Sequence, residues 1–389
     1  MCVIRNCVLC RSELRILTQS KWDIPGLGEK IIGFSHCDLC GMVMQNPTVT
    51  LAEMLSYYET TAVYTRFSKD YKPKKEKLKS VKRNLTDLLS VTGSMPASVL
   101  QVGCSDGYTL SRFRDAGAHY VLGVDPSQLN NRVAKDVYNV DSVCIEFERF
   151  EPEQRFDLAV LTHILEHLYE PRRSLGKCNQ LLNSGGWMLA EVPLLEKEQY
   201  FSTGYLAFEH VNYFTEKLFV QMVESCGFEV HIVNKVFKAY RYPVVTVIAQ
   251  KVTKPDDGFT FHLDDESEGV TQRFLQIDQS NWQRIERRLS AGIPAGADIY
   301  VWGAGIHTAQ LFSNTDILSR YKVQALIDSS ETKWGKSIAG VQCVRPDAAM
   351  LHNSKIVVIS TCASENEVYE NLSAQYSDSL KLFRLYHDA

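Results

Sequence analysis

Short hydrophobic runs recur through the middle of the chain, separated by polar turns and by stretches with helical spacing. Each run is rich in Val, Leu and Ile, which is typical of strands buried on both faces of a sheet. Because strand and helix patterns alternate, we predict a mostly parallel, doubly wound α/β sheet. The runs are SVLQVG (98–103), YVLGVD (120–125), SVCIEF (142–147), FDLAVL (156–161) and WMLAEVP (187–193).

Two later runs, EVHIVNKV (229–236) and YPVVTVIAQ (242–250), are joined by a short connection, which predicts an antiparallel edge to this sheet. A polar, acidic stretch at 251–266 then reads as a linker, and residues 267–290 have helical spacing. Beyond it, DIYVWGAGIHTAQLF, VQALIDSS and KIVVIST again alternate strand, turn and helix patterns. We therefore predict a second Rossmann-like domain at the C-terminus.

The N-terminal region is distinguished by its cysteines, which form two CxxC pairs, Cys7 with Cys10 and Cys37 with Cys40. Two such turns can close a tetrahedral four-thiolate site, so we predict a structural zinc ion here. A redox CxxC would need a βαβ setting, which this region lacks. The predicted parts are therefore a zinc-binding module with a connecting helix (1–75), a central domain (76–252), and a linker helix with the C-terminal domain (253–389).

Composition narrows the functional classes. The formal net charge of −4 over 389 residues leaves no overall basic footprint for nucleic acid. The basic stretch at 72–83 is interpreted as the solvated face of a connecting helix. No apolar run reaches membrane-spanning length, and MCVIRNCVLC lacks the features of a signal peptide. We expect a cytoplasmic protein without nucleic-acid or membrane partners, and the oligomeric state stays open, a monomer included.

The segment THILEH (162–167) contains H-x-x-E-H, the zinc-site pattern of one class of metalloproteases. Its setting is different, because it directly follows the buried run FDLAVL and not the interior of a long helix. His163, Glu166 and His167 are expected to share one face of a strand-to-helix turn. We do not expect a metal here.

The turn VGCSDG (102–107) follows the first central strand, where α/β sheets bind their ligands. Gly103 and Gly107 allow a ligand close to the backbone, and the following helix N-terminus favours an anionic group. Asp125 ends the next strand, about 22 residues after Gly103, where a carboxylate can accept bonds from ribose hydroxyls. The strict dinucleotide pattern is absent because Ser105 occupies the second glycine position.

The ordered motifs VLQVGCSDG, LGVDPS, CIEFE, FDLAVLTHILEHL and GGWMLAEVP resemble those of class I S-adenosylmethionine-dependent methyltransferases over residues 76–250. The resemblance implies that the glycine turn surrounds the methionine part of the cofactor. It also implies that Asp125 holds the ribose and that Glu146 and Phe147 border the adenine. The full set of cofactor-binding residues expected from it is Gly103, Cys104, Asp106, Gly107, Asp125, Pro126, Glu146, Phe147 and His163.

A second Glu-His pair, Glu209 and His210, stands in FEHVNYF after the fifth strand, just before a helical stretch. Loops at that end of the sheet overhang the transferable methyl group, so His210 is a candidate general base. A histidine there can equally have only a packing role, and both interpretations stay open. Tyr205, Tyr213 and Glu191 are further candidates.

Paired zinc knuckles, a methyltransferase domain and a Rossmann-like C-terminal domain together resemble the sugar C-methyltransferases that act on nucleotide-linked 4-keto deoxysugars. HCDLCGMVMQNP is similar to that family's second knuckle, and FEHVNYF to its catalytic segment, although the family's Tyr two places before the Glu is here Ala207. The resemblance implies an enolate mechanism in which His210 takes the proton, Glu209 fixes His210, and Tyr64 closes over the sugar.

The substrate side of the site is less defined. The C-terminal glycine turn could cradle a nucleotide's pyrophosphate or simply permit close packing, and we infer no redox cofactor from it. Sugar O-methylation is the main alternative, and a zinc-ribbon RNA methyltransferase is disfavoured by the acidic balance. The expected substrate-binding residues are Glu166, His167, Tyr205, Tyr213, Gly303, Gly305 and His307.

Overall fold

The computed structural model describes most of the chain, and the structural statements below concern that part. The described residues are 2–60, 73–238, 242–256, 258–346, 355–362, 364–376 and 380–387.

The central sheet has seven strands in the order β10-β11-β8-β7-β4-β5-β6. Its strands from β8 to β6 are parallel, whereas β11 runs antiparallel to both β8 and β10. The predicted doubly wound sheet with an antiparallel edge is therefore confirmed. The strands are β4 (Ser98–Val102), β5 (Tyr120–Val124), β6 (Ser142–Val143), β7 (Phe156–Thr162), β8 (Leu182–Pro193), β10 (Phe228–Val236) and β11 (Val244–Lys251).

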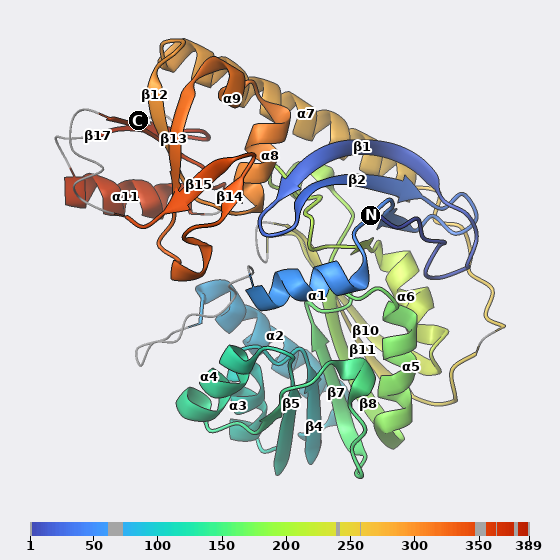
Figure 1. The fold of residues 1–389 in the computed structure, drawn as a ribbon. Coiled ribbons are helices and arrows are strands. Elements are labelled where there is room, and N and C mark those ends of the chain that lie inside the picture. The colour runs from blue at the N-terminus through green and yellow to red at the C-terminus, as the bar shows by residue number, and fades with distance from the viewer. Residues whose placement is uncertain are drawn as a thin grey trace.

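Helices cover both faces of this sheet (Figure 1). On one face, Leu88, Leu110 and Ala134 from three helices share a buried cluster with the sheet. On the other face, Leu175 and Leu218 pack into a separate cluster. The first group is α2 (Lys75–Thr92), α3 (Tyr108–Asp115) and α4 (Gln128–Tyr138), and the second is α5 (Pro171–Leu181) and α6 (Glu216–Glu224).

The N-terminal region forms a four-stranded antiparallel sheet in the order β1-β2-β3-β9. Its last strand comes from the central part of the chain, because Val43 pairs with Tyr213. The sequence did not predict this pairing, which ties the N-terminal region to the segment just after His210. The elements are β1 (Arg15–Ile24), β2 (Gly28–His36), β3 (Val43–Gln45), β9 (Asn212–Tyr213) and the following helix α1 (Leu51–Thr60).

The C-terminal region begins with the long helix α7 (Ser267–Gly292), close to the predicted 267–290. It leads to a six-stranded sheet in the order β14-β15-β13-β12-β16-β17, parallel except for β14 (Figure 1). The strands are β12 (Asp298–Trp302), β13 (Lys322–Ile327), β14 (Ser337–Ile338), β15 (Val341–Val344), β16 (Lys355–Ile359) and β17 (Leu380–Arg384). The helices are α8 (Ile306–Asn314), α9 (Ile317–Arg320) and α11 (Glu365–Tyr376).

No helix in the described ranges combines the length and the apolar character that a membrane span needs.

Candidate active site

The glycine turn lies between β4 and α3, at the carboxyl end of the central sheet. Gly103 and Gly107 have φ angles of +65° and +79°, which side chains with a Cβ rarely adopt. A Cβ at Gly103 would lie 2.8 Å from Ile164 Cδ1, and one at Gly107 would lie 2.7 Å from Ala134 Cβ. Both glycines are therefore required by the backbone conformation and by the close packing of Ile164 and Ala134.

Asp125 ends β5 beside this turn and is only 6% exposed. Its carboxylate accepts hydrogen bonds from the backbone N–H of Ser105 (2.9 Å) and of Ser127 (2.9 Å) and from Asn130 Nδ2 (3.0 Å). Burial raises the pKa of Asp125, against the effect of these donors. A carboxylate offers about four acceptor positions, so one position is left for a ligand hydroxyl.

Asp106 is buried and forms an ion pair with Lys77 at 2.6 Å. Lys77 belongs to α2 and to the basic stretch that the sequence assigned to a solvated face. That interpretation was wrong for this residue, because its ammonium group reaches the buried carboxylate of Asp106. The glycine turn is thus bordered by the carboxylate of Asp106 and the ammonium group of Lys77.

The other expected cofactor residues surround the turn in different ways. Cys104 is buried, and a Cβ added at Gly123 would lie 2.4 Å from its Sγ, so its side chain packs against β5. Phe147 is buried in a short 3₁₀ turn that begins after Glu146. The carbonyl of Pro126 accepts a contact from Cys144 Sγ at 3.3 Å.

The THILEH segment forms the expected turn between strand β7 and helix α5. His163 there has a positive φ of +53°. Its ring lies between two carboxylates, with Nδ1 3.4 Å from Glu166 Oε1 and Nε2 3.2 Å from Glu191 Oε1. Burial lowers the pKa of His163, but the two carboxylates outweigh it and raise the pKa to about 9.

Glu191 ends β8 and is fully satisfied by polar partners from three elements. It accepts hydrogen bonds from Ser80 Oγ (2.7 Å) and Thr246 Oγ1 (2.7 Å) and pairs with Arg83. Although burial opposes ionisation, His163 and Arg83 hold the pKa of Glu191 at about 2. Arg83 is a second residue of the basic stretch that the sequence analysis did not assign to the site.

The structure brings the pair Glu166 and His167 next to the pair Glu209 and His210. The carbonyl of Glu166 accepts the backbone N–H groups of Val211 (2.8 Å) and Asn212 (3.1 Å), which fixes the FEHVNYF segment against THILEH. The rings of His167 and His210 lie edge to face with centroids 4.9 Å apart. Burial lowers the pKa of His210 to about 3, so its imidazole is neutral at neutral pH.

Two tyrosines of α1 complete this cluster, and neither was predicted. Tyr57 donates a hydrogen bond to Glu209 Oε1 at 2.8 Å, and Tyr58 Oη lies 2.9 Å from His167 Nδ1. Glu209 was expected to fix His210, whereas its carboxylate is held by Tyr57. Tyr64, which was expected to close over the sugar, lies outside the described residues.

The remaining aromatic candidates are packed side chains. Tyr205 stacks on Phe201 with ring centroids 4.2 Å apart and also contacts Phe274 of α7. Tyr213 is 2% exposed, and its hydroxyl donates to the carbonyl of Ala207 at 3.2 Å. Both help to shape the wall beside His210.

The C-terminal glycine turn is closely packed at Gly303, and its histidine is held by neighbouring side chains. Gly303 has a φ of +114°, and a Cβ there would lie 2.7 Å from the carbonyl oxygen of Ser360. His307 uses both ring nitrogens, with Nδ1 3.0 Å from Ser360 Oγ and Nε2 2.6 Å from Tyr386 Oη. Gly305 begins α8 with an ordinary negative φ.

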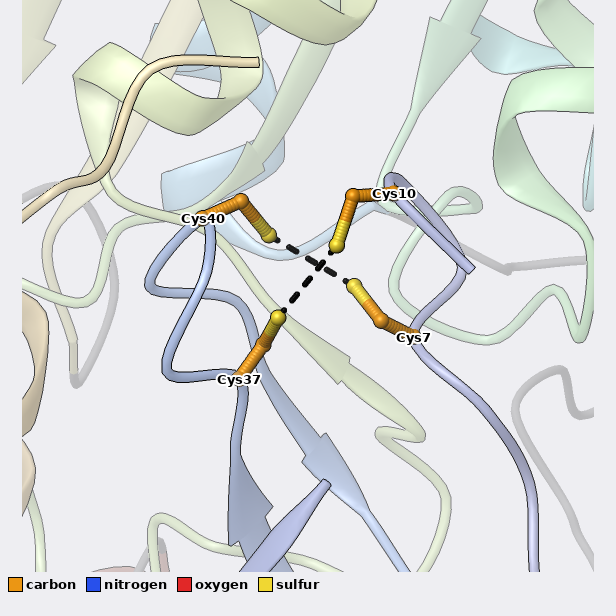
Figure 2. A group of neighbouring side chains, drawn as sticks. All are labelled: Cys7, Cys10, Cys37 and Cys40. Atoms are coloured by element: carbon orange, nitrogen blue, oxygen red, sulfur yellow. Dashed lines mark hydrogen bonds between the residues drawn. The ribbon is translucent and has the colours of Figure 1, made fainter. Parts of the chain in front are cut away.

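The four N-terminal cysteines converge from two turns (Figure 2). Sγ of Cys7 lies 3.5 Å from that of Cys40, and Sγ of Cys10 lies 3.4 Å from that of Cys37. Tetrahedral zinc with Zn–S bonds of about 2.3 Å separates its sulfurs by about 3.8 Å. The donor set and its spacing therefore fit a structural zinc ion, which would close the site fully.

Comparisons with known proteins agree with this geometry in the central region. Residues 73–233 match a family described as "Methyltransferase domain". Ubiquinone biosynthesis O-methyltransferase of Bradyrhizobium sp. (strain ORS 278) is 32% identical over 112 residues, which are 28% of this chain and 43% of that protein. A tRNA U34 carboxymethyltransferase of Shewanella sediminis is 29% identical over 109 residues, 26% of this chain and 33% of that protein.

Among solved structures, the N-methyltransferase NodS from Bradyrhizobium japonicum WM9 in complex with S-adenosyl-L-homocysteine is 13% identical, with a TM-score of 0.40. The alignment covers 51% of this chain and 98% of NodS. The chain spans less than half the length of the curated relatives named above. The matched residues 73–233 thus hold the parallel strands of the central sheet and the glycine turn, and their similarity is to a methyltransferase domain.

Proposed function

We propose that this protein transfers the methyl group of S-adenosylmethionine to a carbon of a nucleotide-linked deoxysugar, next to a 4-keto group. The observation that carries the proposal is the position of both Glu-His pairs beside the glycine turn of a methyltransferase domain. The cysteine cluster and the C-terminal α/β sheet add the two flanking parts expected of sugar C-methyltransferases.

The cofactor would be held by the turn and the acid beside it. Gly103 and Gly107 would hold the turn in the left-handed conformation that its methionine part meets, and Lys77 offers a positive charge to its carboxylate. Asp125 has an acceptor position left for a ribose hydroxyl. When bound, the sulfonium supplies an electrophilic methyl group.

The acceptor carbon must become nucleophilic, and a neighbouring ketone makes its C–H bond acidic enough for an enolate to form. Neutral His210 has a lone pair suited to this site in two ways: it can accept the proton directly, or it can bind a cation that polarises the ketone, in which case the proton passes to water. Glu166, His167 and the wall formed by Tyr205 and Tyr213 would orient the sugar.

The nucleotide would lie toward the C-terminal turn at Gly303 and Gly305. Gly305 supports this placement, because a Cβ there would meet nothing closer than Lys333 Nζ at 3.6 Å. His307 would contribute by holding the turn in shape, since its ring is bonded to Ser360 and Tyr386.

The test is methyl transfer from labelled S-adenosylmethionine to nucleotide sugars with and without a 4-keto group. We expect incorporation only with the keto sugars, and His210→Ala should reduce turnover by about 10²- to 10⁴-fold. His119→Ala, an exposed position in the same domain, is the matched control. Full turnover in His210→Ala, or labelling of no nucleotide sugar, would contradict the proposal.

Sugar O-methylation is a second candidate, favoured by the O-methyltransferases among the similar proteins. It requires a hydroxyl and no enolate. Incubation in deuterated water distinguishes the two, because only the enolate route exchanges the C–H proton of the sugar before methyl transfer.

We also propose that Cys7, Cys10, Cys37 and Cys40 bind one structural zinc ion. Metal analysis of the purified protein should find one zinc per chain. Cys37→Ser should lose the ion and lower the melting temperature, whereas Cys144→Ser, at an exposed thiol, should keep both unchanged. A zinc-free wild type with the same melting temperature would contradict this assignment.

A further inference from the structure

The carboxylate of Glu166 is the least satisfied acidic group at the carboxyl end of the central sheet. It is 1% exposed, and neither oxygen has a hydrogen-bond partner among the described residues. Its nearest charged neighbour there, His163, is shared with Glu191, which has hydroxyl partners of its own. A buried carboxylate without hydrogen bonds is costly, so a further positive group is expected beside it.

We propose that Glu166, His167 and His210 bind one divalent first-row metal ion, such as Mn²⁺ or Zn²⁺. One carboxylate oxygen and one ring nitrogen from each histidine lie within 4.8 Å of one another. Metal–ligand bonds of about 2.0–2.2 Å bring such donors to about 3–4 Å from one another, so inward shifts of about an ångström complete the site. Two imidazoles favour a transition ion over Mg²⁺ or Ca²⁺.

The neighbours of His167 orient its ring for metal binding. Nδ1 lies 2.9 Å from the carbonyl oxygen of Glu209 and 2.9 Å from Tyr58 Oη, and a proton on Nδ1 satisfies the carbonyl, which can only accept. The lone pair is then on Nε2, which lies on the side of Glu166, 3.8 Å from Oε1. A backbone carbonyl that fixes the opposite nitrogen is the usual support of a metal-binding histidine.

The other two ligands, Glu166 and His210, are held in place by the backbone around them. In the described part of the chain, His210 Nδ1 is buried without a hydrogen bond. Backbone bonds from Val211 and Asn212 to the Glu166 carbonyl fix the two segments against each other. The side chain of Asn212 adds bonds to the carbonyls of Leu165 (3.1 Å) and Leu168 (2.6 Å). Such support keeps first ligands in place before an ion arrives.

Three protein ligands leave coordination positions open for a substrate. The inference on the substrate rests on the proposed function: the ion would take the 4-keto oxygen and an adjacent hydroxyl of the sugar as a chelating pair. The H-x-x-E-H segment thus gains a metal role that we did not expect from its sequence context, because the third ligand comes from FEHVNYF.

Mn²⁺ is the probe of choice, because it prefers nitrogen and oxygen ligands and leaves the thiolate cluster to zinc. Titration of the full chain, followed by the loss of the free Mn²⁺ signal in electron paramagnetic resonance, should show one site. Glu166→Gln and His167→Gln should each weaken binding at least about 10-fold. Glu153→Gln and His119→Gln, at exposed positions, are the controls. Circular dichroism verifies the folding of each variant.

Absence of Mn²⁺ binding, or equal binding by wild type and both ligand variants, overturns the metal site. Turnover that is unchanged after chelation, with zinc retained and His210→Ala inactive, also overturns its role and assigns His210 as a direct base. If Mn²⁺ binds and depends on Glu166 but no nucleotide sugar is methylated, the metal site stands and the proposed function fails.

Discussion

The chain contains two units in which a strand is followed by a glycine turn and a helix. In both, an acidic side chain accepts a backbone N–H of the turn, but the surroundings of that acid differ. In the central unit, the acid ending the next strand, Asp125, accepts the backbone N–H of Ser105 at 2.9 Å. In the C-terminal unit, Asp328 accepts the backbone N–H of Ala304, also at 2.9 Å. The acid holds the turn in both units, so this geometry by itself does not identify a cofactor site.

The two units differ in the charge of the groups that contact the acid. Asp328 also pairs with Lys333 at 2.9 Å, and although burial opposes ionisation, Lys333 and backbone donors lower the pKa of Asp328. Asp125 is held by neutral donors, and burial raises its pKa. The C-terminal acid is therefore paired with a lysine within the protein, whereas the central acid is held by backbone and amide donors.

The largest expected effect concerns cofactor affinity. Asp125→Ala should weaken S-adenosylmethionine binding by about 10- to 100-fold, because a charge-assisted hydrogen bond contributes about 1.5–3 kcal/mol. Asp328→Ala should change it less than about twofold on the same scale. Isothermal titration calorimetry measures both, and equal losses in the two variants would erase the distinction between the units.

The second largest effect is expected in stability, where alanine substitutions of the two glycines should differ. Gly107→Ala should lower the free energy of unfolding by about 2 kcal/mol, because φ is +79° and the new Cβ meets Ala134. Gly305→Ala should change it by less than about 0.5 kcal/mol, since its nearest contact is Lys333 Nζ at 3.6 Å. Denaturant unfolding gives both values.

Gly305→Ala has a second use on the substrate side. If the nucleotide approaches this turn closely, the substitution should raise KM for the nucleotide sugar while leaving stability unchanged. An unaltered KM would show that the C-terminal turn only packs.

The smallest effect is in the acid dependence of stability. Because the folded pKa of Asp328 is lowered, its contribution is present above the unfolded pKa of about 3.9 and is lost as pH falls. The stability difference between wild type and Asp328→Asn should therefore shrink on acidification. For Asp125, whose pKa is raised, the difference from Asp125→Asn should change with pH in the opposite direction. Thermal unfolding at a series of pH values tests both signs.

Local patterns predicted much of the fold and part of the site. The alternating hydrophobic runs predicted the central parallel strands, and the antiparallel β10 and β11 followed from their short connection. Glycines with positive φ and an acid ending the next strand are local features as well. These succeed because backbone geometry and strand burial are set by residues close together in the chain.

Only the tertiary structure showed which side chains from distant parts of the chain reach the candidate site. Lys77 and Arg83 looked like solvated charges, and Tyr57 and Tyr58 carried no signal, because each meets a partner distant in the chain.

By itself, the sequence determined the order of the βα units, the cofactor turn with Asp125, and the paired CxxC spacing, all of which depend on short-range geometry. Only the tertiary structure joined Glu166 and His167 to His210, and completed the N-terminal sheet with β9. Those contacts arise from long-range strand pairing and backbone hydrogen bonds, which no periodicity within one segment specifies.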